Sequence, residues 1–238
     1  MTASRADVVA TALADLYRDP AGGRTRLLAS PMGAMPRLGA RLARATFAPG
    51  LLLSDGEATL VDAEDRPRGH LPYERVFDVV WGGRRHVVMG ATQLDAEGNT
   101  NISCIGPHAR PKVQLLGVRG APGNTVHHRT SYWIGRQGPR ILVPEVDVVS
   151  GVGVRRGAAD LHHVVTDLAV FAVVADGQLP AVRLRSVHPG VDLEQVRAAT
   201  GWALGEVGDV PATRAPSDDE RAWLDRLDPD GSVREAMA

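Results

Sequence analysis

The sequence predicts an α/β fold in which an open mixed sheet is flanked by helices. In the first half of the chain, short Val- and Leu-rich runs alternate with helical patterns, whereas strand-like runs cluster in the second half. This order is typical of a sheet that combines parallel and antiparallel strands. The 238 residues, 44% hydrophobic and 23% charged, are enough for a sizeable core. We therefore expect one domain over residues 1–238.

Capping signals predict the starts of three helices. At each start, a Ser or Asp is followed three residues later by an acidic or amide side chain, and apolar residues follow at helical spacing. The three pairs are Ser4 with Asp7, Asp192 with Gln195, and Ser217 with Glu220. A further helix is expected from Arg37 to Thr46, which ends before Ala48-Pro49-Gly50.

Apolar, β-branched runs that are bounded by turn residues predict the strands. The expected strands are residues 51–53, 85–89, 100–105, 112–118, 164–174 and 181–187. Asp176-Gly177 predicts a hairpin turn between the last two. Gly90 and Ala91 follow one apolar run and remove side-chain bulk where a ligand could approach. A plain hairpin around Asp95–Asn99 is the alternative interpretation.

Composition excludes several classes of protein. The formal net charge of -1 gives no electrostatic case for nucleic acid or an anionic membrane surface. The single cysteine, Cys104, excludes an intrachain disulfide and a zinc cluster, and it is expected to be buried. No signal peptide, membrane span, dinucleotide fingerprint, Walker loop or serine-hydrolase elbow is recognisable. A cytoplasmic location is the expectation.

Two histidine pairs and one carboxylate are the local candidates for chemistry. Because neighbouring residues of a strand point to opposite faces, neither His127-His128 nor His162-His163 is expected to chelate a metal from a strand. His127, His128 and Arg129 follow a Gly-rich loop and are candidates for substrate binding. Ser54 and Asp55 directly follow a buried run, where a carboxylate can serve as nucleophile or base. The alternative is a turn in which Asp55 bonds local backbone N–H groups.

Five segments, taken in order, resemble motifs of the beta subunits of class I CoA-transferases, near glutaconate CoA-transferase. Together they are far more specific than any one alone. The segments are Gly90–Asp95 with Gly98–Asn101, Gly106–Val113, Val146–Ser150, Val165–Phe171, and Ser186–Val191 with Thr200–Trp202. The resemblance implies a single beta-subunit domain, related in fold to ribose-5-phosphate isomerase. It also implies an alpha-subunit partner, an α₂β₂ assembly and acyl-CoA substrates, with coenzyme A as part of the substrate and no separate cofactor.

The resemblance weakens where the family carries its catalytic glutamate. That residue attacks the thioester from a position just after a strand, but here the strand end reads Ser54-Asp55-Gly56-Glu57. Asp55 is one methylene shorter and Glu57 lies beyond the glycine, and a displacement of about 1 Å can cost on the order of a hundredfold in rate. This departure, with the sequence from His127 to Trp133, resembles the beta subunits of steroid ring-cleaving acyl-CoA hydrolases, in which the alpha subunit is thought to supply the glutamate.

Three hypotheses follow from the resemblance. In the first, the chain is the beta subunit of a hydrolase that cleaves a C–C bond of a steroid-derived ring. Ser54, Gly90, Ala91, Gln93, His127, His128 and Arg129 then border the substrate, and Asp55 is the one catalytic candidate on this chain. In the second, the chain is a CoA-transferase beta subunit that uses Asp55 or Glu57. In the third, it is a non-catalytic subunit that binds a CoA ligand.

Overall fold

The chain forms two compact units in the computed structural model. Residues Met1–Met89 and Thr213–Ala238 belong to the first unit, and Gly90–Ala212 belong to the second. The structure describes residues 3–18, 27–56, 58–62, 64–72, 74–75, 84–174, 182–205 and 207–237. The expectation of a single domain stays a prediction.

The first unit contains a mixed sheet in the order β5-β1-β2-β3-β4. Its strands are β1 (Leu28–Pro31), β2 (Leu52–Ser54), β3 (Thr59–Val61), β4 (Pro67–His70) and β5 (Arg85–Met89). Strand β1 runs parallel to both β5 and β2, whereas β3 and β4 continue the sheet in antiparallel pairs. Every residue of β5 is buried, the polar Arg85 and His86 as well as the apolar Val87, Val88 and Met89.

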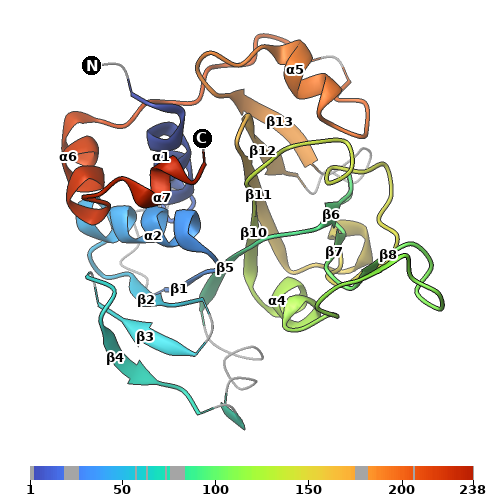
Figure 1. Cartoon of the computed structure of the whole chain (residues 1–238), viewed down its shortest axis with the longest axis horizontal. Helices are drawn as coiled ribbons and strands as arrows, with labels where there is room; N and C mark the ends of the chain where they lie inside the picture. The colour runs from blue at the N-terminus through green and yellow to red at the C-terminus, as the bar shows by residue number, and fades with distance from the viewer. Residues whose placement is uncertain are drawn as a thin grey trace. The chain divides into compact units, whose positions relative to one another are not determined.

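Helices from both ends of the chain accompany this sheet, and Figure 1 shows them grouped together. They are α1 (Arg5–Asp15), α2 (Ala34–Thr46), α6 (Asp218–Leu227) and α7 (Ser232–Glu235). Helices α1 and α6 begin with the predicted capping boxes, formed by Ser4 and Ser217. A Cβ atom added at Gly39 of α2 would lie 2.6 Å from Cβ of Leu13 in α1, so the glycine permits the two helices to pack closely.

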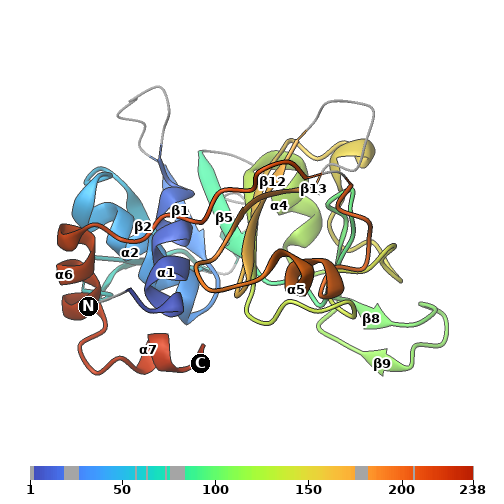
Figure 2. The ribbon, with the colours of Figure 1, turned by 90° about the horizontal axis from the view of Figure 1, so that it is seen from above.

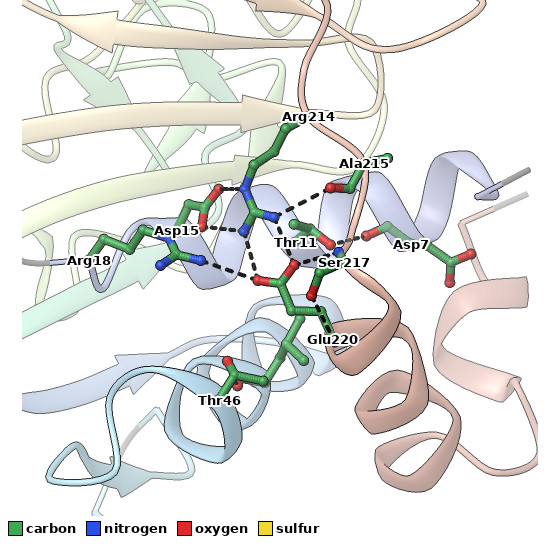
Figure 3. A network of polar contacts seen from close by, with 10 residues as sticks. Asp7, Thr11, Asp15, Arg18, Thr46, Arg214, Ala215, Ser217 and Glu220 are labelled. Carbon is green, nitrogen blue, oxygen red and sulfur yellow. Dashed lines mark hydrogen bonds and ion pairs between the residues drawn. The ribbon is translucent and has the colours of Figure 1, made fainter.

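An ion-pair network, drawn in Figure 3, attaches the C-terminal segment to helix α1. The guanidinium group of Arg214 donates to both carboxylate oxygens of Asp15, each at 2.6 Å, and to those of Glu220, at 2.7 and 2.8 Å. Arg18 adds a second contact to Glu220 at 3.2 Å. Such bidentate pairs have a defined geometry, so they set the position of α6 against α1.

The second unit contains a mixed sheet in the order β13-β12-β11-β10. Strands β10 and β11 are parallel, and the pairs β11–β12 and β12–β13 are antiparallel. The elements are β6 (Gln93–Leu94), β7 (Thr100–Asn101), β8 (Cys104–Ile105), β9 (Val113–Gln114), α4 (Ala121–His127), β10 (Arg129–Ile134), η1 (Val154–Arg156), β11 (Asp160–Thr166), β12 (Ala169–Val173), β13 (Val182–Val187) and α5 (Leu193–Ala198). Figure 2 shows the hairpin β8–β9 extending away from the helices of this unit.

Three strand predictions differ from the structure. The expected strand 100–105 is divided into β7, which pairs with β6, and β8, which pairs with β9. Only Val113–Gln114 of the expected strand 112–118 pairs in a ladder, because the edge of β8 is two residues long. The expected strand 164–174 is divided into β11 and β12 by a turn in which Thr166 Oγ1 accepts the N–H groups of Leu168 and Ala169. The predicted hairpin turn at 176–177 lies outside the described residues.

The fold class is confirmed, since each unit combines a mixed sheet with helices. Cys104 is buried as expected. Among the described residues, no helix is long and apolar enough to cross a membrane.

Replacing Arg214 with Ala should lower the free energy of unfolding by about 1–3 kcal/mol, because the carboxylates of Asp15 and Glu220 lose a shared partner. Hydrogen bonds from Arg214 lower the pKa of Glu220 to about 2. The stabilisation of the folded state by the pair of Arg214 with ionised Glu220 is complete above the ordinary pKa of Glu, and it is lost as the pH falls towards 2. The difference between wild type and R214A, measured by urea denaturation, should therefore shrink from pH 5 to pH 2.

A matched control is Arg66→Ala, which removes an ion pair with Asp62 from a side chain that is 67% exposed. Asp62 keeps the backbone N–H groups of Glu64 and Arg66 and the side chain of Arg68 as partners, so this variant should lose no more than about 1 kcal/mol. Equal effects of R66A and R214A would contradict a special role of Arg214.

Candidate functional site

In the first unit, Ser54 ends strand β2 and its hydroxyl group is used by the fold. The hydroxyl lies 3.1 Å from the carbonyl oxygen of Ala29, to which it donates, and it accepts the N–H of Gly56 at 3.2 Å. The neighbouring Ser30 hydroxyl lies 3.2 Å away and accepts a hydrogen bond from Arg85 Nε at 2.7 Å. The structure therefore places Ser54 in a buried polar chain at the carboxyl end of the parallel strands.

Asp55 forms the first residue of the turn between β2 and β3. Its carboxylate Oδ1 accepts the N–H of Thr59 at 3.1 Å, while its own N–H donates to the Thr59 carbonyl at 2.9 Å. The Arg37 guanidinium group donates to the backbone oxygen of Asp55 at 3.1 Å. These contacts are those of an ordinary turn, the alternative foreseen from the sequence. Glu57 lies outside the described residues.

Gly56 explains why this turn has a fixed position. Its φ of +96° suits glycine, and an added Cβ would lie 2.5 Å from the carbonyl oxygen of Pro31, at the end of β1. The turn that follows β2 therefore packs directly against the backbone that follows β1.

In the second unit, Gln93 joins three segments through one buried amide. Its Oε1 accepts Asn101 Nδ2 at 2.7 Å and the N–H of Asp147 at 3.0 Å, and its Nε2 donates to Asp147 Oδ2 at 3.1 Å. The same carboxylate oxygen accepts the N–H of Gly106 at 2.8 Å. Gln93 was expected to border the substrate, and the structure adds a role in holding these loops.

Gly90 and Ala91 precede this amide network. Gly90 is exposed, and an added Cβ would approach only the Trp133 carbonyl oxygen, at 3.9 Å. Neither residue places side-chain bulk at the start of the second unit. This is consistent with the predicted approach of a ligand.

The turn after β6 is held by a second polar pair. Both oxygens of Asp95 accept Asn99 Nδ2, and Asp95 Oδ1 also accepts the N–H groups of Glu97 and Asn99, each at 3.0 Å. The Asn99 Oδ1 accepts the N–H of Gly153 at 2.8 Å. Burial raises the pKa of Asp95, although these donors oppose the shift. The side chains of the Gln-x-Asp and Gly-Asn-x-Asn motifs thus hold the surrounding loops together by hydrogen bonds. We call the contacts of Gln93 and those of Asp95 the loop clamps.

The three remaining candidates lie side by side where α4 meets β10. His127 ends the helix and is exposed, His128 is the buried C-cap, and Arg129 opens the strand. Arg129 Nε donates to Asp160 Oδ2 at 2.7 Å. The assumption that His127-His128 lies on a strand is wrong, because the pair ends helix α4, which begins at Ala121 with Pro122 in its first turn and which the sequence analysis missed.

His162 and His163 do lie on a strand, β11, and their ring centroids are 4.2 Å apart. Burial lowers the pKa of His162 to about 4 and that of His163 to about 3, and the charges of Arg129 and Arg185 add to the shift. Both rings are therefore neutral at physiological pH. Among the described residues, no group of three or more His, Cys, Asp or Glu side chains could hold a metal ion.

Gln137 is a buried residue that sequence reasoning missed. Thr166 Oγ1 donates to Gln137 Oε1 at 2.7 Å, and Gln137 Nε2 donates to Thr200 Oγ1 at 3.0 Å. The ring of His188 lies 2.9 Å from the backbone oxygen of Thr166. The motif residues that bind Gln137 belong to the Val-Thr-Asp and Thr-Gly-Trp segments, and His188 of the His-Pro-Gly segment joins them through Thr166. These motifs therefore stabilise one end of the sheet of the second unit, and they were the signal that could have led to Gln137.

Comparisons with known proteins first define the class of this chain. No family model matches it. It is 30% identical over 222 residues to the B subunit of the 3-oxoadipate CoA-transferase of Pseudomonas knackmussii, a match that covers 82% of this chain and 84% of the relative. The fold and the loop clamps described above thus belong to a CoA-transferase-type beta subunit.

A higher similarity identifies the family within this class. The chain is 43% identical over 241 residues to the cholesterol ring-cleaving hydrolase IpdB subunit of Rhodococcus jostii RHA1, covering 95% of this chain and 93% of the relative. The crystal structure of Rhodococcus jostii RHA1 IpdAB superposes with a TM-score of 0.89 at 41% identity, covering 100% of this chain and 99% of that chain. The chain belongs to the IpdB family of cholesterol ring-cleaving hydrolase subunits.

The Gln93 clamp can be tested by a double-mutant cycle. Gln93→Ala leaves the buried Asn101 amide with the Cys104 carbonyl alone as acceptor and removes the acceptor of the Asp147 N–H. Each of Q93A and N101A should therefore lower the free energy of unfolding by about 1–3 kcal/mol. The double variant should lose less than the sum, with a coupling of about 0.5–3 kcal/mol in urea denaturation. Gln195→Ala, at an exposed position in α5, is the control. Strictly additive losses would contradict a shared network.

The histidine pair predicts a pH dependence of stability. Because the pKa values of His162 and His163 are lower in the folded state, the unfolded chain binds more protons below pH 6.5. The free energy of unfolding should fall from pH 6.5 towards pH 4, with a limiting slope of about 1.4 kcal/mol per pH unit for each histidine. His163→Asn should reduce this slope, whereas His108→Asn at an exposed position should leave it unchanged. Identical slopes in all three proteins would refute the assignment.

Proposed function

We propose that this chain is the beta-type subunit of a heteromeric acyl-CoA hydrolase that opens a steroid-derived ring by hydrolytic C–C cleavage. The single observation that carries the proposal is the 43% sequence identity with an IpdB subunit over 95% of this chain. An alpha-type subunit is the proposed partner, in a cytoplasmic α₂β₂ assembly. The substrate is an acyl-CoA, and coenzyme A enters only as part of it.

The proposed reaction is the reverse of a Claisen condensation. Water, activated by a carboxylate, adds to a ring ketone, and the adjacent C–C bond breaks. Its electron pair becomes an enolate that the neighbouring carbonyl group stabilises, and this carbanion then takes a proton. One ring fragment ends as a carboxylic acid and the other as a C–H group, so one water is consumed and no covalent enzyme intermediate is needed.

The activating carboxylate is assigned to the alpha-type subunit. Asp55 supports this assignment, because its side chain accepts the N–H of Thr59 and its backbone closes the same turn. The proposed task of this chain is to border the substrate with Gly90 and Ala91. Arg129, oriented by Asp160, would pair with an anionic substrate group.

A CoA-transferase is the second candidate, favoured by the relationship to the 3-oxoadipate CoA-transferase of Pseudomonas knackmussii. It requires a carboxylate of this chain, Asp55 or Glu57, to form an acyl anhydride and then a thioester with CoA. A non-catalytic, CoA-binding subunit is the third. Binding of CoA by the assembled protein without turnover of any acyl-CoA would favour that candidate.

Trapping distinguishes the first two candidates. The complex is incubated with acyl-CoA, treated with hydroxylamine or borohydride, and examined by peptide mass spectrometry. The hydrolase proposal predicts no adduct on this chain, and it predicts that Asp55→Asn and Glu57→Gln keep turnover within about tenfold of wild type. D55N retains the oxygen that accepts the Thr59 N–H, so the turn is preserved.

An adduct at Asp55 or Glu57 would overturn the hydrolase proposal. A matching loss of turnover on the order of 10⁴-fold or more in the corresponding variant would point to a covalent transferase.

A further inference from the structure

We propose that the segment from Cys104 to Arg119, here called the arm, is a docking surface for the alpha-type subunit. The arm consists of the hairpin β8–β9 and the loop that follows it, and Figure 2 shows the hairpin extending from its unit. This inference rests on the proposed function, because it assigns a place on this chain to the partner that the function requires.

Exposed apolar side chains are concentrated in the arm. Within the described residues, six large hydrophobic side chains are exposed, and three of them, Val113, Leu116 and Val118, belong to these sixteen residues. Leu116 is the most exposed of all, at 72%. Clustered apolar exposure on a protein surface marks a place where another molecule is bound. Burial of these side chains would supply the hydrophobic part of an interface.

The arm is held in position without a partner. Lys112 N–H donates to the Ile105 carbonyl at 2.8 Å, and Leu115 N–H donates to the Ser103 carbonyl at 2.9 Å. At its base, Gly106 N–H donates to the Asp147 carboxylate, which the Gln93 clamp also holds. The apolar side chains are therefore presented on an ordered backbone, which reduces the entropy lost on binding.

The charge of the arm indicates the kind of partner. Although 28 of the 238 residues are acidic, the sequence from Gly98 to Pro144 contains no aspartate or glutamate. In the arm, His108, Arg110 and Lys112 are exposed next to Val113. The complementary surface is therefore apolar at its centre and carries carboxylates at its edge.

The positive charge of the arm also favours a different chain over a second copy of this chain as the partner. In a symmetric dimer of this chain through the arm, each arm would meet its own copy, so that Arg110 and Lys112 of both copies would be brought together. Repulsion between like charges disfavours that contact. A different chain with acidic residues at the corresponding positions has no such penalty, and the alpha-type subunit is the partner that the proposed function supplies.

The test uses this chain co-expressed with the alpha-type subunit of the same organism, the homologue of the A subunit of Rhodococcus jostii RHA1 IpdAB. Assembly is measured by sedimentation velocity over a dilution series. Leu116→Asp combined with Val118→Asp should weaken assembly by at least about tenfold, as expected for apolar residues central to an interface. The matched control is Leu52→Asp, at a position on β2 that is 48% exposed.

A second variant tests the electrostatic part. Arg110→Glu combined with Lys112→Glu should weaken assembly at low salt, and the difference from wild type should shrink near 1 M salt, where the Debye length is about 3 Å. All variants should keep the wild-type thermal unfolding of the isolated chain, because the altered side chains are exposed.

Several results would overturn the inference. If the arm variants assemble with the alpha-type subunit as tightly as wild type and L52D do, the inference is wrong and the proposed function is unaffected. A wild-type chain that dimerises alone, and that Leu116→Asp makes monomeric, would assign the arm to self-association. Arm-dependent sedimentation with phosphatidylserine vesicles would assign it to a membrane surface. If the wild-type chain forms no complex with the alpha-type subunit, the proposed function itself fails, and the assigned partner fails with it.

Discussion

The requirement that buried polar groups find hydrogen-bond partners governs the second unit of this protein. Long stretches between β7 and α4, and between β10 and β11, contain little regular structure, so their backbone groups depend on side chains for partners. Gln93 and Asp95 meet this requirement with buried amide and carboxylate groups that bind several loops at once. The loops are consequently ordered parts of the fold, and they can present residues at fixed positions.

Local signals in the sequence predicted three helix starts, at Ser4, Asp192 and Ser217, but they placed the start of α2 three residues late and predicted the strand lengths poorly. The capping boxes at Ser4 and Ser217 depend on residues three positions apart, so they are readable without knowledge of the tertiary structure. Strand limits depend on the partner strand, which explains why only two residues of 112–118 pair. Helix α4 was missed because Gly123 and Asn124 favour turns, and its start is set by Pro122 and by packing against β10.

The candidate site shows the same division between local and tertiary information. The turn contact of Asp55 was foreseen as an alternative, since a short carboxylate after a strand bonds nearby N–H groups. In contrast, the ion pair of Arg129 with Asp160 joins residues on neighbouring strands, and the clamp between Gln93 and Asp147 joins distant loops. Neither could be derived from spacing along the chain. Many of the residues that carry the family resemblance maintain the scaffold, which accounts for a fold that serves transferase and hydrolase subunits alike.

The contact of Arg214 with Asp15 also has a consequence for biosynthesis. The two residues are 199 positions apart, and the whole second unit lies between them. On the ribosome, helix α1 therefore emerges long before the segment that completes its surroundings. The second unit is continuous in sequence and has all its own strands as soon as residue 212 has emerged. The first unit, although it begins earlier, reaches its final packing later, so its apolar helix faces are the part of the nascent chain that needs protection for longest.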